Sequence, residues 1–430
     1  MSKLNKLIQE LCPNGVEYRK LGEIGEYIRG VTYDKKSEVQ NECDAWKVFR
    51  ANNITLSSNT LNFNDIKLVS KSVKVKESQK LVKDDILICA GSGSKDHIGK
   101  VAYIFSDIDY TFGGFMGVIR VNKNILMSRF LFHILTGSLF SKHLEINLNS
   151  STINNLNSQI MNSFEIPLPP LPIQEEIVKI LDRFAEYTAE LQAELQARKE
   201  QYEYYRNLLL TNNFAYGSAD DKQKITGNAR DEWKWMTLGE VGTFTRGNGL
   251  QKKDFTESGV PCIHYGQIYT YYGTSTEKTK SFCSPDLARK LRKAKYGDLV
   301  IATTSENVDD VCKSVVYLGK EEACVSSDAF IYSHNQNPKY IGYFFQTYFF
   351  QKQKLPYITG TKVMRISDKA LSKIQIPIPP LAEQERIVSI LDKFESLVSD
   401  LTQGLPAEIA ASQERYEYYR DKLLRFERCN

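Results

Sequence analysis

The stretch GSGSKDHIGK at 91–100 is the part of the sequence that comes nearest to a catalytic motif. A phosphate-binding loop needs four residues between its glycines and a serine or threonine after its lysine. Here five residues separate Gly93 from Gly99, and Val101 stands at the hydroxyl position. A dinucleotide-binding GxGxxG pattern fails as well, because Asp96 replaces the third glycine. The sequence therefore predicts no phosphate-binding loop here.

Other signatures of catalysis are missing too. Neither GxSxG nor HExxH occurs, and the Pro-Pro pairs follow Leu or Ile, where a methyltransferase motif needs Asn or Asp. The five histidines form no metal-ligand pattern, and no two of the eight cysteines have CxxC spacing. We expect free thiols in a reducing cytosol and no catalysis or cofactor binding by this chain alone.

The start of the chain and its most apolar run bear on its location. MSKLNKLIQELC lacks the apolar segment of a secretory signal. YIGYFFQTYFF at 340–350 is far shorter than the roughly 20 residues that span a bilayer. We expect a cytoplasmic protein without membrane contact.

Several loops combine cations with amide and hydroxyl side chains, the groups that contact nucleic acid. Cations pair with phosphates, while amides, hydroxyls and guanidinium groups bond to base edges. The net charge of +4 is weakly informative, so local clusters must carry the electrostatic argument. The DNA-binding residues that we predict in the first half are Lys35, Lys36, Arg50, Asn52, Asn53, Ser92, Lys95, His97, Ser151 and Thr152. Those that we predict in the second half are Lys252, Lys253, His264, Tyr265, Gln267, Tyr269, Tyr272, Thr304, Ser305, Asn307, Thr361, Lys362 and Arg365.

Two further clusters allow a simpler interpretation beside DNA contact. ARKLRKAK at 288–295 carries five cations in eight residues, which is typical of a solvated helix face as well as of phosphate contact. Tyr269, Tyr271 and Tyr272 either pack against a nucleic-acid groove or close a sheet edge, and the sequence does not separate these roles.

An internal repeat covers nearly the whole chain and indicates which elements position these loops. IPLPPLPIQEEIVKILDRF at 166–184 returns 210 residues later as IPIPPLAEQERIVSILDKF at 376–394. Shorter matches are LGEIGEYIRG with LGEVGTFTRG, DILICA with DLVIAT, and YEYYRNLL with YEYYRDKL. The two variable parts are the least similar, and the two helical parts are the most similar. We interpret this as one scaffold that carries two different readers.

The helical parts each contain a seam of hydrophobic residues with steps of four and three. In the first copy the seam positions are 177, 181, 184, 188, 191, 195, 198, 202, 205 and 209, which predicts a helix of about 38 residues. In the second copy the seam shifts after 405, so we expect a kink or loosening around Gly404 and Pro406. Two equivalent helices that bury their seams against each other would run antiparallel about a pseudo-twofold axis. The alternative is that each helix folds back on its own variable part.

The predicted fold class is α+β, with two α/β recognition domains in a pseudo-twofold arrangement separated by two long antiparallel coiled-coil helices. The predicted boundaries are 1–165 for the first recognition domain, 166–215 for the central helical spacer, 216–375 for the second recognition domain and 376–430 for the C-terminal spacer. Each variable part mixes β-rich runs with Gly-containing turns, as in VKDDILICAGSG.

The sequence resembles the specificity subunits of type I restriction–modification systems. The resemblance rests on the two proline phrases, on the opening LIQELCPNGVEYRKLGEIGE, and on TAELQAEL at 188–195, which is similar to the spacer repeat of one subgroup. It implies a non-catalytic subunit that reads a bipartite, asymmetric site in double-stranded DNA, one half-site per recognition domain. It also implies two methyltransferase subunits and further restriction subunits as partners, to which S-adenosylmethionine, ATP and magnesium would belong.

Residues outside the seam in the two YEYYR phrases allow two interpretations. Glu203, Tyr204, Arg206, Glu417, Tyr418 and Arg420 either contact a methyltransferase subunit or belong to the helix surface. Two other functional classes remain beside DNA reading: a coiled-coil scaffold that binds only protein, and an RNA-binding module. The divergent loops argue against the scaffold, and a long, fixed reach fits straight duplex DNA better than RNA.

Overall fold

The computed structural model describes residues 3–41, 44–92, 97–148, 155–211, 233–399 and 404–429. The chain forms two compact units. Unit 1 contains Met1–Gln192 and Glu408–Asn430, and unit 2 contains Ala193–Ala407. Within the described ranges, no helix combines the length and hydrophobicity needed to cross a membrane.

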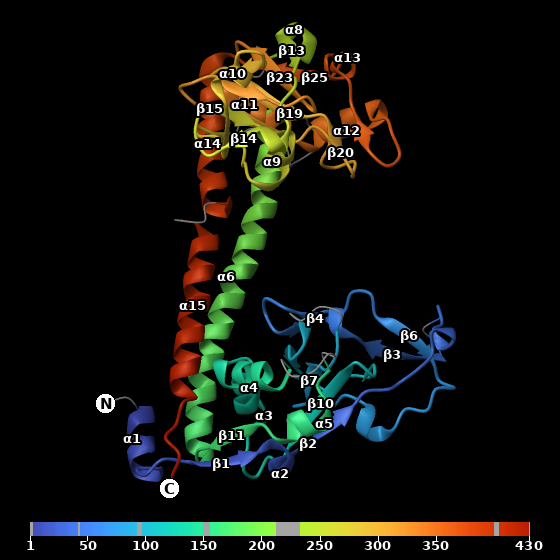
Figure 1. Ribbon diagram of the computed structural model, residues 1–430, viewed down its shortest axis with the longest axis vertical. Helices are drawn as coiled ribbons and strands as arrows, with labels where there is room; N and C mark the ends of the chain where they lie inside the picture. The colour runs from blue at the N-terminus through green and yellow to red at the C-terminus, as the bar shows by residue number, and fades with distance from the viewer. Residues whose placement is uncertain are drawn as a thin grey trace. The chain divides into compact units, whose positions relative to one another are not determined.

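Unit 1 is a two-layer α+β domain packed on helices (Figure 1). A four-stranded antiparallel sheet has the order β2-β10-β7-β8, and a smaller sheet has the order β6-β3-β9. Its helices are α1 (Lys3–Leu11), α2 (Leu21–Ile24), α3 (Ser128–Leu135), α4 (Ser138–Leu148) and α5 (Ser158–Asn162). Its strands are β1 (Glu17–Lys20), β2 (Gly25–Arg29), β3 (Ala45–Phe49), β4 (Ile54–Thr55), β5 (Thr60–Leu61), β6 (Lys67–Ser70), β7 (Ile86–Cys89), β8 (Val101–Tyr103), β9 (Thr111–Phe112), β10 (Met116–Val121) and β11 (Glu165–Leu168).

Unit 2 repeats this plan with additional strands. Its sheets have the orders β13-β23-β19-β21-β16 and β14-β17-β15-β22-β18. Its helices are α8 (Leu238–Val241), α9 (Tyr265–Thr270), α10 (Pro285–Ala288), α11 (Pro338–Phe344), α12 (Tyr348–Lys354), α13 (Asp368–Leu371) and α14 (Leu381–Ser399). Its strands are β12 (Lys234–Thr237), β13 (Gly242–Arg246), β14 (Phe255–Thr256), β15 (Val260–Ile263), β16 (Ser275–Thr276), β17 (Ser281–Cys283), β18 (Lys293–Ala294), β19 (Leu299–Ala302), β20 (Thr304–Ser305), β21 (Ser314–Tyr317), β22 (Ala323–Val325), β23 (Ala329–His334), β24 (Met364–Arg365) and β25 (Gln375–Ile378).

The alternation of side chains along the central strands explains the two layers. Ile86 and Ile88 of β7 point into a core shared with α3, whereas Leu87 and Cys89 point into a core shared with the smaller sheet. Successive residues of a strand face opposite sides of its sheet, so both faces of β7 are covered. All four residues are fully or almost fully buried, and β19 has the same pattern in unit 2.

Each unit contains the same backbone hydrogen bond at an equivalent position. Gly30 donates its N–H to the Met116 carbonyl, and Gly247 donates to the Ala329 carbonyl. A Cβ atom at Gly30 would lie 2.1 Å from the Gly113 oxygen, and one at Gly247 would lie 2.3 Å from the Ser326 oxygen. No side chain fits at either place, which explains why both copies of the LGE…RG phrase end in glycine.

The helical prediction is confirmed for the first copy. α6 (Leu171–Thr211) has 41 residues, and all ten predicted seam positions are buried or half-buried. Within unit 1, α6 and α15 (Leu405–Leu423) lie side by side (Figure 1). Phe184 stacks on Tyr419 with ring centroids 5.4 Å apart, and Thr188 bonds to Ser412 at 2.9 Å. Residue numbers rise along one helix as they fall along the other, so this pair is antiparallel.

The second copy differs from a continuous helix, in the place where the sequence predicts loosening. α14 ends at Ser399 and α15 begins at Leu405, so the described helices stop on either side of 400–403. Pro406 lies in the first turn of α15, where its missing N–H costs nothing. In unit 2, α6 contacts α14 through Tyr205 and Phe394, whose rings stack at 5.5 Å.

The proline phrases join each recognition domain to its helix. β11 pairs with β1 and β25 pairs with β12, and each helix begins directly after a Pro-Pro pair. The next glutamine of each phrase, Gln174 or Gln384, is fully buried. Gln174 accepts a bond from the Met127 N–H at 2.9 Å and donates to the Pro169 carbonyl at 2.8 Å. Gln384 repeats both bonds, so the phrase is a structural joint.

Candidate nucleic-acid interface

Each unit brings together two of the predicted DNA-contacting loops. In unit 2, β20 pairs with β24, so Thr304 lies opposite Arg365. In unit 1, Gly91 forms a single β-bridge with Asn155. The residues beside these pairings make equivalent bonds, from the Leu156 N–H to the Ala90 carbonyl and from the Ile366 N–H to the Thr303 carbonyl. Among the described residues, Gly91 and Asn155 of unit 1 thus occupy the place that β20 and β24 occupy in unit 2.

A third loop joins this group in unit 2. The Tyr269 hydroxyl donates to the Thr304 carbonyl at 2.6 Å. Burial raises the pKa of the Tyr269 hydroxyl, so it remains a proton donor at neutral pH. Asn307 is exposed and bonds to Asp310 at 2.6 Å, which orders the turn after β20. Lys354, which is only 1% exposed, donates to the Asp309 and Val311 carbonyls at 2.9 and 2.6 Å and holds the same loop from below.

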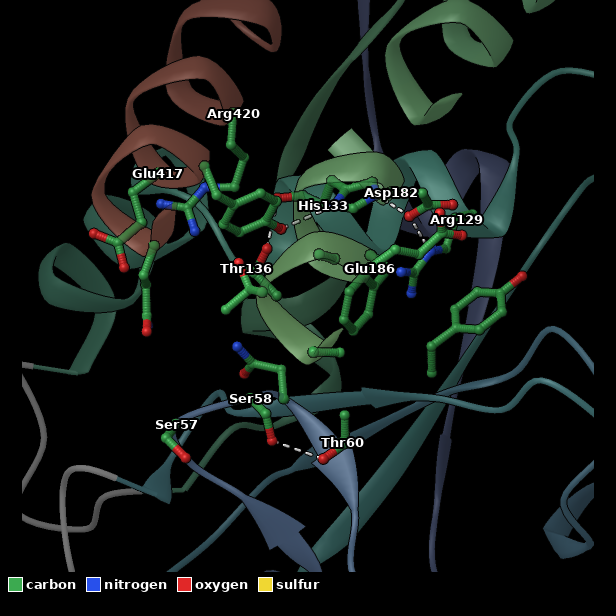
Figure 2. Close-up of a pocket in the computed structure, with 18 of the residues that line it drawn as sticks. Ser57, Ser58, Thr60, Arg129, His133, Thr136, Asp182, Glu186, Glu417 and Arg420 are labelled. Carbon is green, nitrogen blue, oxygen red and sulfur yellow. Dashed lines mark hydrogen bonds and ion pairs between the residues drawn. The ribbon is translucent and has the colours of Figure 1, made fainter. Parts of the chain in front are cut away.

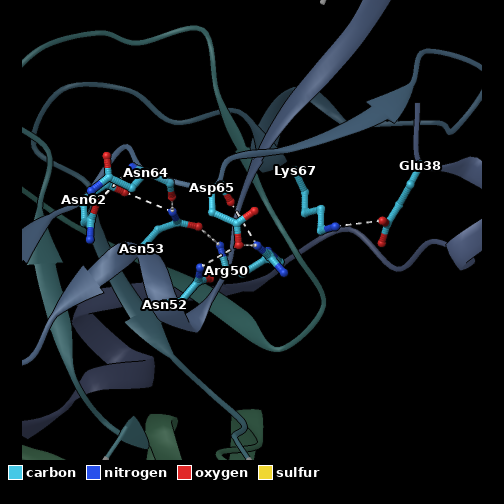
Figure 3. Close-up of polar contacts among 8 residues, drawn as sticks. All are labelled: Glu38, Arg50, Asn52, Asn53, Asn62, Asn64, Asp65 and Lys67. Carbon is cyan, nitrogen blue, oxygen red and sulfur yellow. Dashed lines mark hydrogen bonds and ion pairs between the residues drawn. The ribbon is translucent and has the colours of Figure 1, made fainter. Parts of the chain in front are cut away.

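A fourth feature is the turn that follows β3 in unit 1 and β15 in unit 2. In each turn a buried amide side chain accepts the backbone N–H of the residue three positions before it. Asn53 accepts from Arg50 at 2.8 Å, and Gln267 accepts from His264 at 3.1 Å. Both amide groups also donate hydrogen bonds. Asn53 donates to the Asn62 and Asn64 carbonyls (Figure 3). Gln267 donates to the Ser281 hydroxyl. These amides therefore hold the turns from inside.

The exposure of the predicted DNA-binding residues divides them into groups. Exposed residues are Lys35, Lys36, Asn52, Lys252, Lys253, Asn307, Thr361, Lys362 and Arg365, and half-buried ones are Arg50, Ser92, His97, Tyr265, Tyr269 and Ser305. Buried residues are Asn53, His264, Gln267, Tyr272 and Thr304. Lys95, Ser151 and Thr152 lie outside the described residues.

Burial corrects the prediction for the five buried side chains. Each is at most 8% exposed, so little of its side chain is accessible to DNA in this conformation. Burial raises the pKa of the Tyr272 hydroxyl to about 12, and its oxygen accepts the Lys280 N–H at 2.8 Å. Burial lowers the pKa of His264, whose Nδ1 accepts the Gly266 N–H at 3.2 Å. We assign to these residues the role of holding the loops.

The YEYYR phrases also divide by exposure. Arg206 lies over the Tyr202 ring at 5.0 Å and bonds to Gln346, and Arg420 lies over the Tyr416 ring at 5.4 Å. Both guanidinium groups are thus used within their own units. Glu203, Glu417 and Tyr418 are exposed, whereas Tyr204 is half-buried against Tyr205.

A cavity of about 420 Å³ in unit 1 lies among α3, α6, α15 and the β4–β5 hairpin (Figure 2). Beside it, Asp182 of α6 binds Arg129 at 2.8 Å and His133 at 2.9 Å, and His133 binds the Tyr416 hydroxyl at 3.0 Å. Burial lowers the pKa of His133, and Asp182 only partly opposes this effect. Burial alone would raise the pKa of Asp182, but His133 and Arg129 lower it overall. This network attaches α3 to both helices.

Unit 2 has an equivalent network, but a carboxylate replaces Ala185, the small residue that lines the cavity in unit 1. At the 210-residue offset of the repeat, Lys339 and Tyr343 bind Asp392 at 2.9 and 2.5 Å. Glu395 stands at the position of Ala185 and binds both Tyr343 and Thr274. Glu395 thus has polar partners in unit 2, whereas Ala185 lines the cavity in unit 1.

Some residues that shape these loops carry no signal in the sequence. The loop of 62–65 contains no cation, so no charge pattern marked it, yet it lies against the turn of 50–53 through Asn53. Lys354 reads as a surface lysine because its two carbonyl partners lie more than 40 residues away in the chain. Within the described parts of the chain, no three His, Cys, Asp or Glu residues are placed to hold a metal ion.

Comparisons with known proteins agree with this arrangement. The chain is 35% identical over 276 residues to the EcoR124I/EcoR124II specificity subunit of Escherichia coli, covering 61% of this chain and 63% of that subunit. It is 26% identical to the EcoKI specificity subunit of Escherichia coli strain K12, covering 89% of this chain and 82% of that subunit. A solved structure described as "Structural basis underlying complex assembly and conformational transition of the type I R-M system" contains a chain with the same fold, at a TM-score of 0.60 and 18% identity, covering 96% of this chain and 98% of that one.

The family comparison covers most of the chain. Residues 13–220 and 230–411 match the family described as type I restriction modification DNA specificity domain. The two matches correspond to the two copies of the repeat, each with its own recognition sheet and proline phrase. This chain therefore belongs to the family of type I restriction–modification DNA specificity subunits.

Proposed function

We propose that the chain reads a bipartite, asymmetric site in double-stranded DNA, with one half-site per unit. The observation that carries this proposal is the combination of a shared backbone with different loop side chains. Arg50 and Asn52 of unit 1 stand where unit 2 has His264 and Gly266. Two readers with the same frame and different chemistry fit a site whose halves differ in sequence.

Exposed cations support the contact with DNA. Lys35 and Lys36 lie in one short 3₁₀ helix and Lys252 and Lys253 in its counterpart, and all four are exposed. Lys362 and Arg365 lie on the loop that pairs with Thr304 and Ser305. Lysines of this kind neutralise phosphates, while the amides beside them are suited to base edges. Neither a protein-only scaffold nor an RNA-binding module gains support from the comparisons.

The arrangement of the two units belongs to the same proposal. We place them about a pseudo-twofold axis, with α6 and the α14–α15 pair as spacers that set the gap between the half-sites. TAELQAEL at 188–195 lies inside α6, and this supports assignment to the subgroup with repeats of that type. A helix gains about 1.5 Å per residue, so four added residues would lengthen the spacer by about 6 Å.

We also propose that two methyltransferase subunits and further restriction subunits bind this chain. Glu203, Glu417 and Tyr418 are exposed at the two ends of the helical parts, and exposed tyrosines are favoured at interfaces. S-adenosylmethionine, ATP and magnesium would be bound by those partners.

A methylation map of random duplex DNA tests the proposal. The complex of this chain with its methyltransferase subunits is incubated with S-adenosylmethionine, and methylated sites are read by sequencing. We expect one motif with two specific parts separated by a gap of fixed length. Preference for structured RNA over duplex DNA in a gel-shift assay, or methylation without a bipartite motif, would contradict the proposal.

A further inference from the structure

Asp65 lies beside the two polar side chains that unit 1 presents next to β3, and no role in DNA reading is assigned to it (Figure 3). Its carboxylate accepts from Arg50 Nη2 at 2.7 Å and from the Asn52 amide at 3.3 Å. The Asp65 carbonyl accepts from the same Nη2 atom at 2.9 Å. One residue therefore orients both candidate base readers.

The backbone of Asp65 is itself in an uncommon conformation. Its φ angle is +52°, in the left-handed region that residues other than glycine seldom adopt. Aspartate and asparagine tolerate this region because their short side chains can bond locally. Such conformations persist where surrounding contacts impose them and are enriched at functional sites.

The surrounding contacts come from Asn53. Its buried amide donates to the Asn62 carbonyl at 3.0 Å and to the Asn64 carbonyl at 2.8 Å. Asn64 N–H in turn bonds to the Asn62 side chain at 2.8 Å. These bonds fix the loop of 62–65 against the turn of 50–53. Asp65 is therefore held within hydrogen-bond distance of Arg50.

The hydrogen bonds of Arg50 within unit 1 leave its Nη1 group available for DNA. Arginine has five N–H donors. Asp65 occupies Nη2, and Nε is buried without a partner, while no bond from Nη1 to another described residue is found. An arginine fixed on one side by a carboxylate can meet a guanine edge with little loss of side-chain freedom.

We propose that Asp65 is a positioning residue, which fixes Arg50 and Asn52 as one rigid reader of adjacent bases in the half-site of unit 1. This inference rests on the proposed function. It does not require Asp65 to touch DNA, and its negative charge should weaken non-specific attraction to phosphates.

Methylation maps of Asp65→Ala and Asp65→Asn, made with the full complex, test this role. In both variants we expect discrimination at one or two adjacent base pairs to fall by about tenfold, the scale of one arginine–guanine pair. The other half-site and the gap should stay unchanged. Asp65→Asn keeps a residue that tolerates the left-handed backbone, so a loss shared by both variants reports the missing charge and not a collapsed loop.

Matched variants separate positioning from general effects. Arg50→Ala should relax the base pair that Arg50 reads, and the double variant of Arg50 and Asp65 should relax this base pair no further than Arg50→Ala alone. Glu38→Ala removes a carboxylate that bonds to Lys67 on the neighbouring strand and does not contact Arg50, so its map should equal that of the parent protein. Affinity of Asp65→Ala for DNA without the site should be equal or higher.

The outcomes that overturn the inference are distinct from failure of the proposed function. An unchanged map for both Asp65 variants, or relaxation spread over both half-sites, would contradict the role of Asp65 while leaving DNA reading intact. A parent complex that methylates no bipartite motif would remove the DNA-reading function, and the inference with it.

Discussion

Lys354→Met should destabilise unit 2 and loosen one of its reading loops. Lys354 ends α12, is 1% exposed, and donates to the Asp309 and Val311 carbonyls. Burial lowers the pKa of its ammonium group, against the opposing influence of Cys312, Asp309 and Asp310. Methionine keeps the apolar stem and removes the donors, so two carbonyls of the loop lose their partner.

The expected cost follows from those two bonds. Each buried carbonyl left without a partner costs about 1–3 kcal/mol. Removing the buried ammonium group also removes its own desolvation cost, which offsets part of the loss from the two carbonyls. We therefore expect the free energy of unfolding of unit 2 to fall by about 2–4 kcal/mol. At roughly 2–4 °C per kcal/mol for a unit of this size, its transition should move down by about 5–15 °C.

Calorimetry of the full chain with its methyltransferase partners measures this shift. Lys352→Met is the control, since Lys352 is exposed on the same helix. The methylation map should also relax in one half-site, because Ser305 and Asn307 precede the same two carbonyls. If Lys354→Met melts with the parent protein, the two bonds do not support the loop and the reasoning is refuted.

Three further predictions concern the glycines, the spacer and the half-buried His334. Gly30→Ala and Gly247→Ala should each lower the free energy of unfolding of their own unit by about 1–3 kcal/mol, because the Cβ atom would lie 2.3 Å or less from a carbonyl oxygen; urea midpoints equal to that of the parent would contradict this. Inserting AELQ after Leu195 should lengthen the methylated gap by one or two base pairs and leave both half-sites unchanged, and an unaltered gap would exclude α6 as the ruler. Burial lowers the pKa of His334 to about 4. The free energy of unfolding should therefore be highest above about pH 6.5. It should fall by at most about 1.4 kcal/mol per pH unit as the pH decreases towards 4, because the unfolded chain binds the proton first. Urea midpoints of His334→Phe should therefore fall less steeply over this range than those of the parent protein.

The helical scaffold was predictable because its signal is local. Seam positions follow from the spacing of apolar side chains along one helix, and all ten positions in α6 are at least half-buried. The beginning of α6 and α14 follows from the Pro-Pro pairs. The break between α14 and α15 is signalled by Gly404 and Pro406, which lie within three residues of each other.

The interface was less predictable because its bonds join distant segments. Asn53 and Gln267 offer the same donors and acceptors whether they face DNA or their own backbone, and the sequence does not identify the partner. Both turn inward. The glutamine of each proline phrase repeats in the sequence, but its bonds to the segment before α3 or α11 depend on the tertiary fold. The partners of a polar side chain can therefore be identified only from the structure, whereas the burial of a helix face can be predicted from the spacing of its apolar residues.

The two joints show how far the repeat constrains each half. Asp182 and Asp392 both anchor a cation from the recognition domain, so this part of the frame is common to the two units. The position three residues later differs, since Ala185 lines a cavity in unit 1 and Glu395 binds Tyr343 and Thr274 in unit 2. A first recognition domain placed on α14 would bring His133, at the position of Tyr343, against both Asp392 and Glu395, where unit 1 offers it Asp182 and Ala185. Exchange of the readers between the halves therefore changes the groups that meet position 185 or 395, even though the backbone frame is shared.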